Sequence, residues 1–412
     1  MTTTLPQTAM NLGATAIRRI SDHLDEPDWL RELRSRWWER ASATPPPTGQ
    51  EEEWRRTNLA GLPRDGELLL DAPNLEATDP QSGVILTDLA TAVREHPDLV
   101  RRFLGTAEGP ASHAHFWALA QAAWTGGLFC YVPRNVAVDG TLVARTVLPR
   151  TDATYLPVTL VVAEEGSSIT LLEEVVSADG PAGWFGGIVE IRAERGARVR
   201  YANLQQLGPG AWNIGAQRVV VGQDANVTTL NAEVGSRITK VGIDVKMTGA
   251  GGTSKVLGLL AAGDDQQIDI NTVQDLAADH TTSDLLYLSA LYDRAHASFY
   301  GVTNVRHGTR QTSSYQECRN LLLSPQAGAE PIPVLEIEAN DILRCGHGAT
   351  AGAIDPTQLF YAQTRGLDHD AAERMIVRGF FEQVVAQIAD ETIRERILAA
   401  LAGRIGSTED SS

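Results

Sequence analysis

The residues best suited to chemistry lie in the stretch RCGHGATAG, where Cys345 stands two positions before His347 and a glycine flanks the histidine on each side. In an extended strand, residues two apart share a face, so Leu343, Cys345 and His347 are expected to point the same way. A thiolate and an imidazole are ligands for iron or zinc, and a neighbouring base can activate a thiol. The glycines permit a sharp bend or the close approach of another backbone or a ligand.

Two ligands do not close a metal site. On spacing alone, the favoured interpretation is that Cys345 is a small core residue and His347 a hydrogen-bonded corner histidine. Cys318 lies 27 residues upstream of Cys345, which is close to the length of the sequence repeat described below. Because stacked coils are ~4.8 Å apart, its thiol is expected near that of Cys345. Cys130, in GLFCYVP, alternates with apolar residues and is expected in the core.

Composition excludes several classes of partner. A chain of 412 residues has room for roughly two or three domains of ~100 to 200 residues. The net charge of -17 disfavours nucleic acid, and no window approaches the ~18 to 20 apolar residues of a membrane span. The N-terminus lacks the features of a secretory signal, and three cysteines make no disulfide framework. A cytoplasmic location is therefore expected.

The elements that must position these residues are strands that recur in the middle of the chain. The first ~130 residues read as helices joined by breakers, including EPDWLRELRSRWWERA, whose Trp29, Leu33 and Trp37 share a face. Beyond them, the corners EEGSSITLL, ERGARVRYA and GQDANVTTL return every 28 to 30 residues. A fixed period of this size favours a parallel β-helix over a β-sandwich.

Helical signals return near the C-terminus. Asp355 is placed as a cap, Pro356 at the first helical position and Gly366 at the stop, and an apolar stripe follows. The predicted divisions are a helical region at 1–127, a parallel β-helix at 128–354, a helical domain at 355–405 and a disordered tail at 406–412. The fold class is mainly β.

No enzyme signature is complete. GAGGTSK lacks the glycine that a phosphate loop needs before its lysine, and GPGAWNIG lacks the third glycine of a dinucleotide site. HExxH, calcium-loop and GxSxG patterns are absent from the sequence.

Longer phrases with a recognisable pattern are spread over much of the chain. They are EEWRRTNLAGL at Glu52, FWALAQAAWTGGLFCYVPRNVAV at Phe116, RNLLLSP at Arg319, PVLEIEANDILRCGHGATAG at Pro333, DPTQLFYAQTRGL at Asp355 and MIVRGFFEQVV at Met375. These phrases resemble the SufB/SufD family, the scaffold subunits of the Suf iron-sulfur cluster assembly machinery, and the likeness is strongest to its SufD-type members.

The resemblance implies a right-handed parallel β-helix flanked by helical domains, acting as a non-catalytic scaffold. It implies pairing with a SufB-type paralogue through the β-helix, and binding of SufC, an ABC-type ATPase, through the C-terminal domain. ATP hydrolysis would then come from SufC. A transient iron-sulfur cluster would form at the SufB interface. A flavin is not indicated by the sequence, and a homodimer of the isolated chain stays open.

The resemblance also ranks the candidate ligands. His347 matches the histidine implicated at the cluster-forming interface, and Cys345 follows it. Cys318 is a weaker candidate, because it falls where SufB-type chains place their assembly cysteine. Two alternatives remain: a SufB-like homodimeric scaffold that uses Cys318, and, from a different class, a β-helix enzyme acting on polysaccharides.

Overall fold

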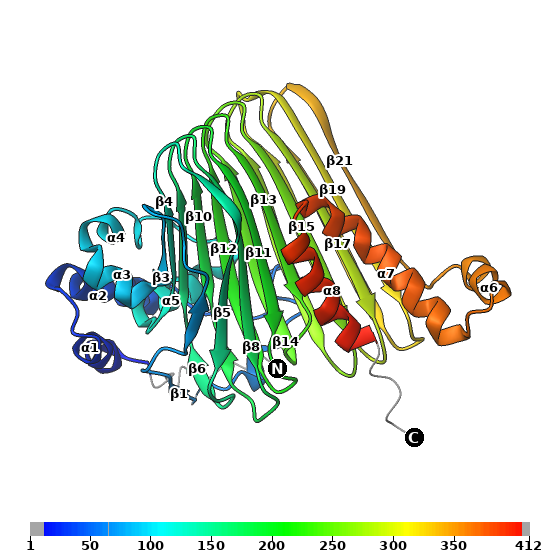
Figure 1. Cartoon of the computed structure of the whole chain (residues 1–412), viewed down its shortest axis with the longest axis horizontal. Coiled ribbons are helices and arrows are strands. Elements are labelled where there is room, and N and C mark those ends of the chain that lie inside the picture. Colours follow the sequence, from blue (N-terminus) through cyan, green and yellow to red (C-terminus); the bar gives the residue numbers. More distant parts are fainter. Residues whose placement is uncertain (1–11, 65, 406–412) are drawn as a thin grey trace.

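The chain forms a solenoid of β-strands with helices packed at its flanks, as the computed structural model in Figure 1 shows. The structure describes residues 12–64 and 66–405. The predicted disordered tail at 406–412 lies outside this range. Among the described residues, no helix combines the length and apolar character needed to cross a membrane.

Two sheets make up the solenoid, and the chain alternates between them as it runs along the solenoid axis. Sheet A contains β3 (Ile85–Asp88), β4 (Gly127–Val132), β7 (Val158–Ala163), β10 (Ile188–Ala193), β12 (Trp212–Val221), β14 (Ile238–Met247), β16 (Gln267–Leu276), β18 (His296–Val305) and β20 (Gly328–Ile337), with β1 (Glu67–Leu68), β6 (Ala153–Tyr155) and β9 (Trp184–Phe185) at its side. Sheet B contains β2 (Leu75–Ala77), β5 (Ala137–Leu148), β8 (Ser168–Ser177), β11 (Arg198–Gln206), β13 (Asn226–Glu233), β15 (Thr253–Ala262), β17 (Thr282–Leu291), β19 (Arg310–Leu322) and β21 (Asp341–Gly352).

The predicted repeat is confirmed by the strand register. From β5 to β21, partners on neighbouring parallel strands of sheet B are 27 to 31 positions apart. The corners that recur in the sequence turn through left-handed residues, which are Gly166, Gly196 and Asp224. Glycine and aspartate accept that conformation at little cost, so each coil can turn at the same point. The mainly β, parallel solenoid expected from the sequence is therefore observed.

The solenoid core lies between the inner faces of the two sheets. It is built from small and branched apolar residues, with Cys130 fully buried among them as predicted. Central strands are covered on both faces, so β7 is buried along its whole length. Parallel strands covered on both sides read as continuous apolar runs, as VTLVVA does.

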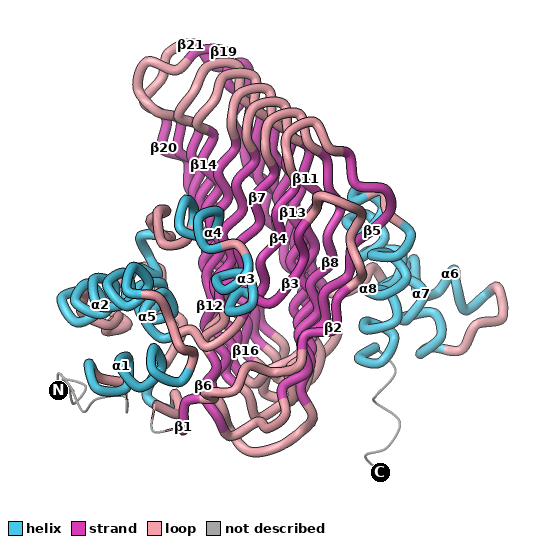
Figure 2. Tube along the Cα trace, turned by 60° about the vertical axis from the view of Figure 1, so that its left-hand side comes forward, coloured by secondary structure: helices cyan, strands magenta, loops and turns pink. Residues whose placement is uncertain are grey.

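N-terminal helices cover the outer face of sheet A. Figure 2 shows them on the opposite flank of the solenoid from the C-terminal helices. The predicted helical region also supplies the short strands β1, β2 and β3 ahead of the solenoid. The helices are α1 (Ala14–His23), α2 (Asp28–Ala43), α3 (Leu89–Glu95), α4 (Pro97–Phe103) and α5 (Ala114–Ala123).

Two C-terminal helices, α7 (His369–Ile388) and α8 (Glu391–Ile405), cover the outer face of sheet B. The preceding helix α6 (Pro356–Thr364) packs on α7 and lies away from the sheet in Figure 1. Asp355 accepts a hydrogen bond from the Thr357 amide at 2.8 Å, and Gly366 turns left-handed with φ +95°, as the sequence predicted. Phe381 and Ile388 of α7 are fully buried in the cluster that α7 and α8 form with sheet B.

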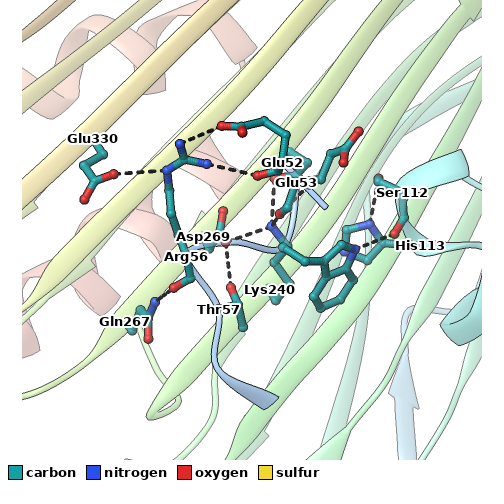
Figure 3. Close-up of polar contacts among 12 residues, drawn as sticks. Glu52, Glu53, Arg56, Thr57, Ser112, His113, Lys240, Gln267, Asp269 and Glu330 are labelled. Carbon is teal, nitrogen blue, oxygen red and sulfur yellow. Dashed lines mark hydrogen bonds and ion pairs between the residues drawn. The ribbon is translucent and has the colours of Figure 1, made fainter. Parts of the chain in front are cut away.

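A polar segment before the first strand holds the N-terminal region to sheet A, and Figure 3 shows its contacts. The Nζ of Lys240 lies 2.8 Å from Asp269 Oδ2 and also donates to the Glu53 carbonyl. Asp269 accepts a second hydrogen bond from the Thr57 hydroxyl at 2.6 Å. Since Lys240 and Asp269 are both buried, these contacts fix residues 52–57 against β14 and β16.

Candidate functional site

The C-terminal end of the solenoid is open, and its last two strands differ in chemistry. β20 and β21 each pair with one strand only, so each presents a free edge. β20 carries Pro331 and Pro333, which have no amide proton to donate, whereas β21 contains no proline. An edge with a full row of unpaired amides and carbonyls is a template for a strand from another chain. The free edge of β21 is thus the better surface for strand pairing.

Strand β21 carries both leading candidates on one face. Cys345 stands opposite Ser314 of β19, and His347 stands opposite Gln316. Ser314 and Gln316 are buried and point into the solenoid, so Cys345 and His347 continue that inward row at its open end. His347 is exposed and Cys345 is half-buried. The predicted sharing of a face by this pair therefore agrees with the register.

Leu343 does not follow the predicted alternation. The register slips between the Thr312–Ile342 and Ser313–Arg344 pairs, which makes Leu343 the extra residue of a bulge. Its side chain is 70% exposed. Bulges at the end of a sheet re-aim side chains, and a strict period of two cannot foresee them.

The glycines beside His347 make room for an aromatic ring from the coil below. A Cβ on Gly348 would lie 3.1 Å from the Tyr315 hydroxyl, and one on Gly346 would lie 3.4 Å from a Tyr315 ring carbon. The Arg344 guanidinium covers the same ring, 4.2 Å from its centroid. The close approach that the sequence suggested is made by Tyr315 and not by a backbone.

Cys318 is separated from the other two candidates. It stands opposite Ala349, four positions along β21 from Cys345, which corresponds to roughly 13 Å of strand. The expectation that the two thiols are near neighbours was wrong, because the last coil of sheet B spans 31 residues and not 27. Cys318 is buried in the solenoid core and accepts a hydrogen bond from Asn320 at 3.6 Å.

Burial sets the reactivity of the three thiols. It raises the pKa of Cys130 and of Cys318 to about 12, so both are protonated and inert at neutral pH. Partial burial raises the pKa of Cys345 as well. A bound metal ion, which is positively charged, would favour its thiolate. Of the three cysteines, Cys345 is the one with access to solvent.

Polar side chains line part of the solenoid interior, a feature that the sequence analysis missed. Glu173 accepts hydrogen bonds from Thr159 at 2.7 Å and from Tyr201 at 2.5 Å, and Glu233 accepts one from Asn213 at 3.1 Å. They border an internal cavity of about 40 Å³. Burial raises the pKa of Glu233 to about 7. Alternate residues of a strand point inward, so a list of every second residue would have revealed these polar positions from the sequence.

Cys345 and His347 can hold only part of a metal centre. No group of three or more histidine, cysteine, aspartate or glutamate side chains in the described part of the chain is placed to bind a metal ion. A tetrahedral iron or zinc site needs four ligands. The described part of this chain therefore supplies two of those ligands at most at this end of the solenoid.

Comparison with known proteins identifies the family. A family model described as the SufBD core domain of SUF system FeS cluster assembly matches residues 147–380, which is more than half of the chain. The chain belongs to the SufBD family. The iron-sulfur cluster assembly protein SufD of Bacillus subtilis is 27% identical over 97% of this chain and 99% of its own length. A SufBD family protein of Staphylococcus saprophyticus is 28% identical over 81% of this chain and 71% of its own.

These matches support a SufD-type member of the SufBD family with a role in iron-sulfur cluster assembly. The matched core contains β6 to β21 and therefore includes Cys318, Cys345 and His347. The comparisons confirm the family and the general role that the sequence resemblance implied. The roles of the three residues stay predictions.

Proposed function

We propose that this chain is a non-catalytic scaffold subunit that supplies part of the site where an iron-sulfur cluster is built. The observation that carries the proposal is the free edge of β21, which carries Cys345 and His347, the two candidate metal ligands, at the open end of the solenoid. Strand pairing across this edge would bring ligands from a SufB-type paralogue to the same place. The cluster is then cargo, shared between two chains.

The C-terminal helices are the proposed docking site for a SufC-type ATPase. Phe360 and Tyr361 of α6 and Met375 of α7 are more than half exposed, although α7 is firmly anchored to sheet B. Exposed apolar side chains on α7 and on α6, which packs against it, suit a protein interface. ATP-driven movement of the ATPase could reach the β21 edge through these helices, because α7 packs on β15 and β17.

Cys318 is not needed in this proposal. Its thiol faces the core and its raised pKa disfavours the thiolate. The alternative of a homodimeric scaffold using Cys318 requires this strand to open.

The test is the iron and sulfide content of the complex purified without oxygen after co-expression with SufB-type and SufC-type partners. His347→Ala is expected to lose most of the bound iron and sulfide while keeping the partners and the circular dichroism of the wild type. His307→Ala changes another exposed histidine of the solenoid and serves as the matched control. Cys318→Ser is expected to keep its iron. Full iron content in His347→Ala, or loss in Cys318→Ser, would contradict the proposal.

A further inference from the structure

A groove of about 530 Å³ lies between α2 and α4 in the N-terminal region, on the flank of the solenoid away from the C-terminal helices. We propose that this groove docks an acidic segment of a partner protein, anchored by apolar side chains. The inference is independent of the proposed role of the β21 edge.

The floor of the groove is aromatic and apolar. Trp29, which is half-buried, forms its accessible part, and Leu33 and Trp37 of the same α2 stripe lie buried beneath it with Leu104 after α4. Trp37 has an indole N–H with no acceptor among the described residues. Gly105, with φ +68°, keeps that group clear, because a Cβ there would lie 2.7 Å from Trp37 Nε1.

The rim of the groove is cationic. Arg36, Arg40 and Arg101 line it, with Glu32 as the acidic residue among its lining groups. Arg36 and Arg101 form no ion pair with any residue that the structure describes, and Arg101 lies 6.0 Å from the centroid of the Trp29 ring. The groove thus places two unpaired arginines beside an aromatic side chain, in a chain with a net charge of -17. Planar guanidinium groups bind carboxylates through paired hydrogen bonds.

Arg40 is held by an exchangeable contact. It forms two hydrogen bonds of 2.8 Å with Glu108, whose side chain is 72% exposed. Because both side chains are exposed, water and other carboxylates compete for this contact. A carboxylate of a partner can exchange with Glu108 when it offers the same paired hydrogen bonds to Arg40.

The shape of the groove favours a peptide over a compact ligand. Its lining runs along α2 from Trp29 to Arg40, a distance of ~16 Å at the helical rise. That length matches about three turns of a helix or about five residues of an extended chain. Tryptophan and arginine are also the residues that dominate the energetics of protein interfaces.

The experiment is selection of peptides from a random display library on the full-length protein, followed by fluorescence anisotropy with the selected peptides. Peptides rich in aspartate or glutamate and carrying an apolar residue are expected. Arg36→Glu with Arg101→Glu should weaken their binding by at least about tenfold, since two charge-assisted contacts become repulsive. Arg198→Glu with Lys255→Glu makes the same change of charge at exposed, unpaired positions on sheet B and should leave affinity unchanged.

Three results would overturn the proposal. The first is a selection without enrichment of acidic residues, and the second is equal affinity in the groove variant and the wild type. The third is self-association of the wild type, seen by sedimentation and lost in the groove variant, since the occupant would then be a second copy of this chain. Thermal unfolding of both double variants checks that they are folded.

Discussion

Replacing Lys240 by methionine is expected to release the N-terminal segment from sheet A. The Lys240 ammonium is fully buried, 2.8 Å from Asp269 Oδ2 and 2.8 Å from Asn271 Oδ1. Burial lowers the pKa of Lys240, and Asp269 opposes that shift. Methionine fills the space but leaves the Asp269 carboxylate buried with the Thr57 hydroxyl as its remaining donor among the contacts in Figure 3.

The expected loss of unfolding free energy in Lys240→Met follows from that geometry. Removing one partner of a buried ion pair costs ~3 to 5 kcal/mol, because the other charge is left without compensation. Removing both partners is much less costly, so Lys240→Met with Asp269→Leu should recover most of the loss. Lys246→Met is the matched control, since Lys246 is exposed on the same strand and should change stability by no more than ~0.5 kcal/mol.

The assay combines urea unfolding with hydrogen exchange of peptides covering residues 52–57. In Lys240→Met, both the urea midpoint and the protection of that segment should fall, and the double variant should regain them. A free energy of unfolding of Lys240→Met within ~1 kcal/mol of the wild-type value would refute the reasoning. So would a double variant as unstable as the single one, because the pair would then act through packing and not through charge.

Two further predictions concern the buried acids and the thiols. Between about pH 4.5 and 7, Glu233 is protonated in the native state but ionised in the unfolded chain. The free energy of unfolding of the wild type should therefore fall by ~3 kcal/mol relative to that of Glu233→Gln as the pH rises through this window. Parallel stability curves for the two proteins would contradict this. In a native maleimide reaction followed by mass spectrometry, Cys345 should react first and Cys130 and Cys318 only after unfolding. Equal labelling of Cys318 would show that the core strand opens.

Local signals were enough to predict the repeat and the helix ends. Left-handed corners return at a fixed interval, and Asp355 with Gly366 marks both ends of α6, because each signal depends on a few neighbouring residues. The shared face of Cys345 and His347 also follows from local alternation. These features need no knowledge of distant contacts.

Contacts between residues on different coils could not be predicted from local sequence signals. The offset between Cys318 and Cys345 depends on how many residues the last coil takes, and a small error in coil length moves a residue along its neighbour. The pairing of Lys240 with Asp269 joins adjacent coils and is completed by Thr57 from a distant segment. Gly346 and Gly348 of β21 are explained by Tyr315, which lies one coil earlier. Each case depends on register, which is a property of the whole solenoid.

Native mass spectrometry of the complex, purified without oxygen after co-expression with SufB-type and SufC-type proteins, tests the central claim most directly. The account predicts one copy of this chain with one SufB-type chain and two SufC-type chains, with added mass matching iron and sulfide. It further predicts that the added mass disappears in His347→Ala while the assembly of chains persists. A chain found alone, or bound only to itself and without the ATPase, would contradict the account.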